Sequence, residues 1–274
     1  MSVVIWGKAG SGKTTLASTA PGKKLWLNFD PDGTLSLLNR DDIIVLDLSY
    51  EHFSVTEKFR SDDPFGLVKA LTDNPSIGTV VVDSITSYMM LATEQAVKIQ
   101  STDRNKVSIE QPGQGGYSVR NNISLRLFVC IMRLTKKLNR HFIALTHEGS
   151  PINDDKGNLE SIPPALSGNL MNQIGLQTNE IWHLELTEKG QRRILVRPGR
   201  WCKPMKSRMF SEKSGAEFVW NYDAETLQGE GIEQWYEKWL ANGGKKIMLP
   251  GQVGSAGATN ATTTTATTVT QIKK

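Results

Sequence analysis

The stretch that decides the fold is Gly7-Lys8-Ala9-Gly10-Ser11-Gly12-Lys13-Thr14, which matches the pattern GxxxxGK[ST] at every fixed position. An apolar run at residues 3–6 precedes it, and a helical pattern at residues 13–18 follows it. A phosphate-binding loop requires this order, because glycines let backbone N–H groups turn toward an anion and the helix presents its positive end. The alternative is a chance glycine-rich turn. The expected nucleotide-binding residues are Gly7, Lys8, Ala9, Gly10, Ser11, Gly12, Lys13, Thr14 and Thr15.

Outside this loop, apolar runs alternate with helical patterns. Strands are predicted at 24–29, 43–48, 79–82 and 141–146, and helices at 65–71, 87–100, 117–139 and 232–240. Runs at 180–186 and 193–196 predict a hairpin about Gly190. Polar segments at 101–116 and 148–168 are expected to be loops. The fold class is therefore α/β: a mostly parallel sheet with helices on both faces, plus a C-terminal β-hairpin and helix.

The charge is uneven along the 274 residues. Residues 243–274 hold four lysines and no acidic residue, so they account for the whole net charge of +4. Their Gly, Ala and Thr content cannot build a core. We therefore expect a nucleotide-binding domain at residues 1–242 and a disordered tail at residues 243–274. Residues 1–242 carry no net charge, so the overall charge of the chain does not indicate nucleic-acid binding. Such binding would require a local basic patch on the surface.

Other classes of protein are disfavoured. The chain contains no apolar run of 18 residues and no secretory signal, so we expect no membrane association. Two cysteines, Cys130 and Cys202, are too few for a disulfide scaffold. A cytoplasmic location is the expectation.

Asp83 follows the apolar run Thr79–Val82, at the strand end where open α/β sheets bind ligands. We expect Thr14 and Asp83 to hold Mg²⁺, Asp83 through water, and Lys13 to bridge the β- and γ-phosphates of ATP. The alternative for Asp83 is a cap on the helix that follows it.

Hydrolysis also needs a group that orients water. Asp30 and Asp32, in the sequence Asp-Pro-Asp-Gly, are candidates, although the same residues are strong turn formers without any catalysis. His147 ends the strand at 141–146 and is a candidate γ-phosphate sensor; the alternative is a structural histidine. His147-Glu148 lacks a second histidine at zinc-protease spacing, so it predicts no metal motif.

These motifs, in this order, resemble those of RecA-like P-loop ATPases, and more closely the compact phage ATPases of that superfamily, some of which are single-strand DNA annealing proteins in recombination. The resemblance rests on residues 7–14, 30–33, 80–84 and 146–148, takes in Gly116-Tyr117, and spans roughly residues 1–210. It implies that Asp32 matches the catalytic glutamate, with one methylene less. It also implies that Asp83 matches the Mg²⁺-linked aspartate and that His147 matches the sensor.

The resemblance further implies a homo-oligomer, single-stranded DNA as a partner, and a single-strand binding protein as a second candidate partner. Residues 148–175 lie where RecA-like proteins place a DNA-contacting loop. The glycine loop begins at residue 7, so we expect no N-terminal polymerisation region of the kind found in RecA.

A basic segment at residues 192–208 contains seven basic residues and no acid. Three interpretations remain open. The arginines at 192, 193 and 197 form a solvated strand face; Lys206 and Arg208 reach a neighbouring subunit's γ-phosphate as catalytic groups; or the segment, with Trp201, binds single-stranded DNA. The basic residues of the helix at 117–139 are interpreted as an ordinary solvated face.

The function expected from these observations is an ATP-binding and ATP-hydrolysing phage recombination protein acting on single-stranded DNA. The alternatives are a nucleotide-dependent assembly or accessory ATPase that binds no DNA, and a small-molecule kinase. The acidic turn and the lack of an evident lid with paired arginines weigh against the kinase.

Overall fold

The structure is a computed structural model of the chain. It describes residues 1–30, 33–37, 40–48, 63–101, 107–166, 170–199, 201–202 and 204–251.

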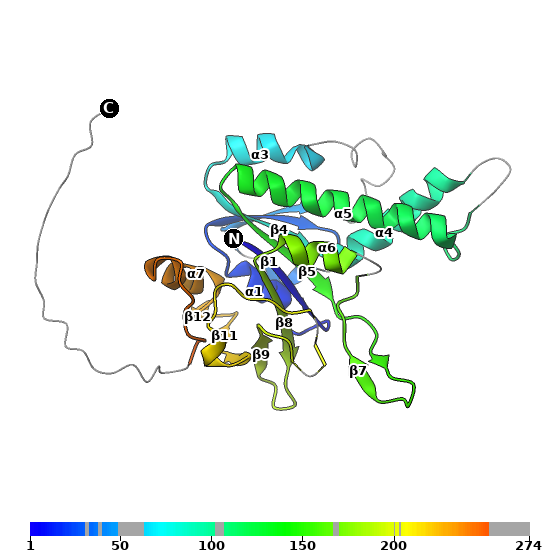
Figure 1. The fold of residues 1–274 in the computed structure, drawn as a ribbon. Coiled ribbons are helices and arrows are strands. Elements are labelled where there is room, and N and C mark those ends of the chain that lie inside the picture. The colour runs from blue at the N-terminus through cyan, green and yellow to red at the C-terminus, as the bar shows by residue number, and fades with distance from the viewer. Residues whose placement is uncertain are drawn as a thin grey trace, which may run out of the picture.

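An eight-stranded sheet forms the centre of the molecule, in the order β10-β9-β8-β1-β5-β4-β2-β3 (Figure 1). Its strands are β1 (Ser2–Gly7), β2 (Lys23–Asn28), β3 (Ile43–Asp47), β4 (Ile77–Asp83), β5 (His141–His147), β8 (Glu180–Leu186), β9 (Arg192–Leu195) and β10 (Glu217–Trp220). Pairing is parallel from β3 through β8 and antiparallel from β8 through β10. The central strands are apolar on both faces because helices cover both sides.

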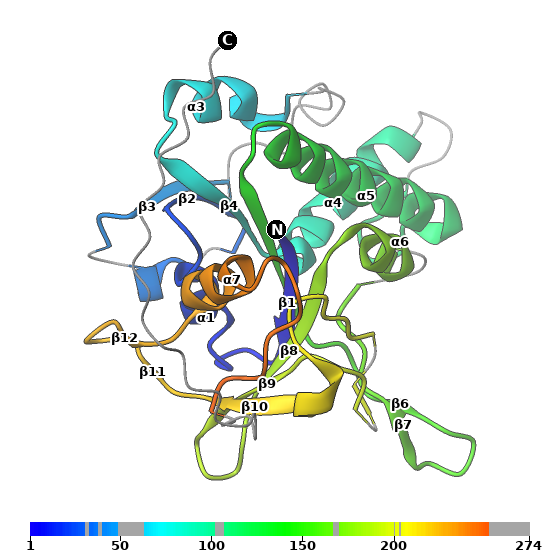
Figure 2. The ribbon, with the colours of Figure 1, turned by 60° about the vertical axis from the view of Figure 1, so that its left-hand side comes forward.

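The helices lie in two layers, as Figures 1 and 2 show from two directions. One face carries α3 (Leu67–Asp73), α4 (Ile85–Gln100), α5 (Gly113–Lys137) and α6 (Leu170–Gln177). The other carries α1 (Lys13–Ser18) and α7 (Ile232–Ala241). Alternation along β1 divides the core: Val4 and Trp6 pack with the first layer, whereas Val3 and Ile5 pack with the second.

Two small hairpins lie outside the main sheet. They pair β6 (Ile152–Asn153) with β7 (Leu159–Ser161), and β11 (Tyr222–Asp223) with β12 (Gln228–Gly229). The β6–β7 hairpin projects away from the body of the molecule in both views (Figures 1 and 2). It falls within the segment expected to be a loop, so that expectation missed the short strands.

The expected fold class is confirmed, with local differences. Helix α5 begins at Gly113, inside the segment expected to be a loop, and the Gly116 amide donates to the Pro112 carbonyl at 3.1 Å. An added side chain at Gly115 would stand 2.4 Å from the Gln100 amide oxygen, so the glycines permit close approach to the end of α4. Helix α6 and strand β10 were not predicted, because each is a short element without a long periodic pattern.

The ordered chain also continues beyond residue 242, where the domain was expected to end. Ile247 and Leu249 pack against the core layer that contains α1 and α7, and Lys246 forms an ion pair with Glu212 at 2.8 Å. The rest of the expected tail, residues 252–274, lies outside the described residues. In the part of the chain that is described, no helix combines the length and the apolar character that a bilayer crossing requires.

Candidate nucleotide-binding site

The glycine-rich loop lies between β1 and α1, as the sequence predicts. Residues 8–12 form the turn, and Lys13, Thr14 and Thr15 form the first turn of α1. Gly10 and Gly12 have φ angles of 75° and 98°, a left-handed region that side chains disfavour. The motif therefore needs glycine at these two positions for backbone conformation.

Two polar groups of the loop are placed for a ligand. The Lys13 ammonium donates to the Gly7 carbonyl at 2.9 Å and to the Lys8 carbonyl at 2.8 Å, so it lies across the mouth of the loop. The Ser11 hydroxyl is buried and has no hydrogen-bond partner among the described residues. Burial lowers the pKa of Lys13, and the carboxylates of Asp83, Glu148 and Asp30 oppose that shift. An orphaned hydroxyl beside a buried ammonium fits an anionic phosphate group.

Thr14 and Asp83 meet across the end of the sheet. The Thr14 hydroxyl donates to Asp83 Oδ2 at 3.2 Å, and Ser84, not Asp83, caps helix α4 by accepting from the Ser87 amide. Burial raises the pKa of Asp83 to about 6, against the opposing effect of the Thr14 hydrogen bond. A hydroxyl and a carboxylate oxygen form a donor set that Mg²⁺ accepts, so these two residues fit the ion.

His147 and Asp30 form a second pair at the same edge, where β5 and β2 end. His147 Nε2 lies 3.7 Å from Asp30 Oδ2, and both side chains are one-third exposed. The His147 amide donates to the Thr86 hydroxyl at 3.0 Å, which fixes the end of β5 against α4. Burial and the neighbouring Lys13 charge lower the pKa of His147, so the ring is neutral at pH 7. Asp32, the residue that the resemblance matches to a catalytic carboxylate, lies outside the described residues.

Glu148 is a nearly buried carboxylate whose role its sequence context did not predict. Its Oε2 lies 3.0 Å from His183 Nε2, and its Oε1 lies 3.9 Å from the Lys8 ammonium in the glycine loop. His183 in turn lies 3.5 Å from the Cys202 sulfur and packs against the Trp6 ring at 4.1 Å between centroids. This chain of contacts connects the loop to the basic segment at 192–208, and no sequence motif could have indicated it.

Arg192 lies against the loop from the other side. A side chain added at Gly12 would stand 2.7 Å from the Arg192 Nε, and the guanidinium lies 5.9 Å from the Trp220 ring centroid. No ion pair joins Arg192 to a described residue. None of the interpretations left open for the segment at 192–208 placed Arg192 beside the glycine loop, so this proximity is a second feature that sequence analysis missed.

The other basic residues of the segment have partners within the chain. Arg193 pairs with Glu185 and Glu217, and the Arg197 guanidinium donates to the Phe210 carbonyl at 2.6 Å. The Lys206 ammonium donates to the carbonyls of Gly175 and Thr178 at 3.2 and 2.8 Å, at the end of α6. These bonds favour a structural role for the three residues. Arg208 is exposed, and Arg200 and Lys203 lie outside the described residues. The catalytic role expected for Lys206 and Arg208 in a neighbouring subunit stays a prediction.

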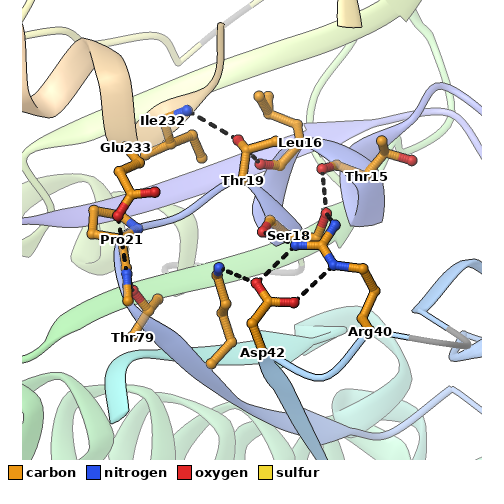
Figure 3. Close-up of polar contacts among 12 residues, drawn as sticks. Thr15, Leu16, Ser18, Thr19, Pro21, Arg40, Asp42, Thr79, Ile232 and Glu233 are labelled. Atoms are coloured by element: carbon orange, nitrogen blue, oxygen red, sulfur yellow. Dashed lines mark hydrogen bonds and ion pairs between the residues drawn. The ribbon is translucent and has the colours of Figure 1, made fainter. Parts of the chain in front are cut away.

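The end of α1 opposite the loop is fixed by a polar cluster, drawn in Figure 3. The Thr19 hydroxyl accepts from the Ile232 amide at 2.9 Å, which joins α1 to the start of α7. Nearby, Asp42 accepts from Arg40 at 2.8 Å and from the buried Lys24 at 2.7 Å. The Arg40 hydrogen bonds hold the pKa of Asp42 well below its usual range. The helix behind the phosphate loop is therefore anchored at both ends.

Residues 1–209 match the family described as AAA domain. Among solved structures, the crystal structure of the RadB recombinase is similar, with 16% identity, a TM-score of 0.43, and coverage of 81% of this chain and 87% of that chain. A comparison with curated proteins finds no match.

Proposed function

The chain belongs to the AAA-domain family, and we propose that it is an ATP-hydrolysing recombination protein of the compact phage type that acts on single-stranded DNA as a homo-oligomer. The observation that carries the proposal is the convergence of Lys13, the Thr14–Asp83 pair and the Asp30–His147 pair at one edge of the sheet. These are a phosphate-binding cation, a metal-binding pair and an acidic group near a neutral imidazole, which together suit phosphoryl transfer to water.

Each residue then has a distinct role. Lys13 leaves its two loop carbonyls for the β- and γ-phosphates, and Ser11 contributes its free hydroxyl. Thr14 and Asp83 would hold Mg²⁺, and the ion would supply positive charge against the charge that develops on the phosphates. Arg192, beside Gly12 and without an acidic partner among the described residues, contacts the phosphates from the outer side of the loop.

Asp30 is the better supported of the two candidates for orienting water. Its carboxylate faces His147, and its charge acts on both Lys13 and Asp83. His147 is neutral at pH 7, so it donates a hydrogen bond to the γ-phosphate without repelling Lys13. Glu148 couples the loop to the segment at 192–208 through His183 and Cys202.

The test separates binding of ATP from its hydrolysis. We expect Lys13→Ala to lose ATP binding, measured by calorimetry. Asp30→Asn keeps binding and slows single-turnover hydrolysis by about 10²–10³-fold. Asp32→Asn is the matched control. If Asp32→Asn slows hydrolysis and Asp30→Asn does not, the water-orienting role belongs to Asp32.

The DNA-binding part has its own measurement. A labelled single-stranded oligonucleotide is titrated with protein in the absence of nucleotide, with ADP and with a non-hydrolysable ATP analogue. We expect the analogue to tighten binding in the wild type and to have no effect in Lys13→Ala. ATP hydrolysis without oligonucleotide binding in any state would replace the proposal with an assembly ATPase that binds no DNA.

A further inference from the structure

A cavity of about 630 Å³ lies at the edge of the sheet opposite the glycine loop. The start of β1 and the start of β5 line it, at Ser2 and Phe142, together with the C-terminal ends of α5 and α6. Because β1 and β5 are parallel and in register from Ser2–Phe142 to Gly7–His147, their other ends carry the nucleotide site. The cavity is therefore separate from the site already described.

Four cationic side chains line this cavity, namely Arg133, Lys136, Arg140 and Arg208, and none of its described lining residues is acidic. None of the four forms an ion pair within the described ranges of the chain. The Arg140 Nε is buried and has no hydrogen-bond partner there. Glu180, a buried carboxylate of β8, accepts hydrogen bonds from the Arg208 and Met209 amides at 2.8 and 2.9 Å. The four positive charges in this cavity repel one another, and an anionic ligand bound among them would reduce that repulsion.

A second hollow of about 320 Å³ continues the basic surface along α5. Arg133 lines both hollows, and Arg126 and Lys137 line the second. From Arg126 to Lys137 the helix axis advances about 16 Å, at a rise of about 1.5 Å per residue. This length exceeds the span of a single phosphate group and matches a run of several. Six residues form this basic track: Arg126, Arg133, Lys136, Lys137, Arg140 and Arg208.

The cavity walls also offer surfaces for bases. Tyr236, from α7, lines the cavity and packs edge-on against His141 at 4.7 Å between ring centroids. The exposed Leu176 lines the same wall. Positive charge that follows a backbone, beside aromatic and apolar surface, is the combination that binds single strands, because unpaired bases present faces for stacking. A duplex keeps its bases stacked inside and gains nothing from these rings.

We propose that the basic track binds the phosphate backbone of a single nucleic-acid strand, with bases resting against Tyr236 and Leu176. The inference rests on the proposed function and gives its DNA a location. It also changes the interpretation of the cations of α5, which the sequence indicated only as a solvated face. In the segment at 192–208, Arg193, Arg197 and Lys206 are bound within the chain, whereas Arg208 faces the cavity.

The test measures anisotropy of a labelled oligo-dT with the full chain and the ATP analogue, across a salt series. The track variant is Arg133→Gln/Lys136→Gln/Lys137→Gln, because all three side chains are exposed and their neutralisation leaves the core intact. The control variant is Lys69→Gln/Lys98→Gln/Lys213→Gln, which removes the same charge from exposed positions on other surfaces.

We expect the track variant to bind the oligonucleotide at least roughly tenfold more weakly than the wild type. The plot of log affinity against log salt concentration should become less steep by about 2, at about 0.7 per lost phosphate contact. The control keeps the wild-type affinity and slope. Equal loss in both variants, no loss in the track variant, or tighter binding of a duplex of the same length would overturn the inference while leaving the proposed function in place. Failure of the wild type to bind any oligonucleotide would overturn both. ATP binding, measured in parallel, stays unchanged in the track variant.

Discussion

The molecule holds two groups of basic side chains that look alike in the sequence and differ in the fold. Beside α1, Lys24 and Arg40 both bond to Asp42, at 2.7 and 2.8 Å, and Lys24 is buried. At the far edge of the sheet, the four cations of the cavity have no acidic residue among the described lining. In the first group a carboxylate of the chain itself neutralises the cations, whereas in the second group an anionic ligand would have to do so.

This difference shows that the pairing of each cation, and not the number of cations, separates structural charge from charge available for binding. The segment at 192–208 makes the point within one stretch of chain. It is the most basic run in the sequence, yet Arg193 has two carboxylate partners and Lys206 bonds to backbone carbonyls. A charge count alone would place the binding surface there.

Breaking the paired group has the largest expected effect on stability. Asp42→Ala leaves the buried Lys24 ammonium without a partner, and we expect a loss of about 2–3 kcal/mol in the free energy of unfolding. Urea unfolding followed by tryptophan fluorescence measures it. The double variant Lys24→Met/Asp42→Ala removes the orphaned charge and recovers part of the loss. A single variant as stable as the wild type would contradict a structural role for the pair.

The same group predicts a pH dependence. Arg40 holds the pKa of Asp42 well below its usual range, so the unfolded chain binds this proton more readily than the folded one. The stabilisation is therefore complete above the unfolded pKa of about 3.9 and is lost as pH falls below it. We expect the stability gap between wild type and Asp42→Asn to be the same at pH 7 and pH 5 and to narrow below about pH 4. A gap that widens on acidification would reverse the assigned sign.

Removing an uncharged hydrogen bond of the same cluster should reduce the free energy of unfolding by a smaller amount. Thr19→Val removes the hydroxyl that accepts from the Ile232 amide, and we expect a loss of about 1–2 kcal/mol in unfolding free energy. Thr19→Ser keeps the hydroxyl and serves as the control. If Thr19→Val and Thr19→Ser lose equal stability, methyl packing rather than the hydrogen bond joins α1 to α7.

Supplying a counter-charge to the unpaired group should have the smallest effect on stability and the most specific signature. Gln177 lines the cavity, and Gln177→Glu places a carboxylate among its cations. We expect unfolding free energy to rise by roughly 0.5 kcal/mol and oligonucleotide affinity to fall several-fold. Gln191→Glu, at an exposed turn, makes the same change of charge elsewhere. If unfolding free energy and oligonucleotide affinity both rise, or both fall, the result would argue against an anion site in the cavity.

The features that could be predicted from the sequence are those that a short, continuous stretch of residues determines. Residues 2–18 contain the strand, the glycine turn and the helix of the phosphate loop. The valine run before Asp83 places that carboxylate at the sheet edge, where the structure brings it to Thr14. The pairing of Glu148 with His183 could not be predicted, because the residues are 35 apart and meet only through the side-by-side placement of β5, β1 and β8. The cavity depends likewise on the convergence of α5, α6 and the segment around Arg208.

The contact between Thr19 and Ile232 joins residues 213 positions apart, and it bears on how the chain matures. During synthesis the nucleotide motif leaves the ribosome first, but the helix behind it lacks its last partner until residue 232 has been made. A ligand stabilises a protein only when it binds the folded form more tightly than the unfolded form. ATP is therefore expected to act as a folding aid for the finished chain and not for its nascent N-terminal fragments.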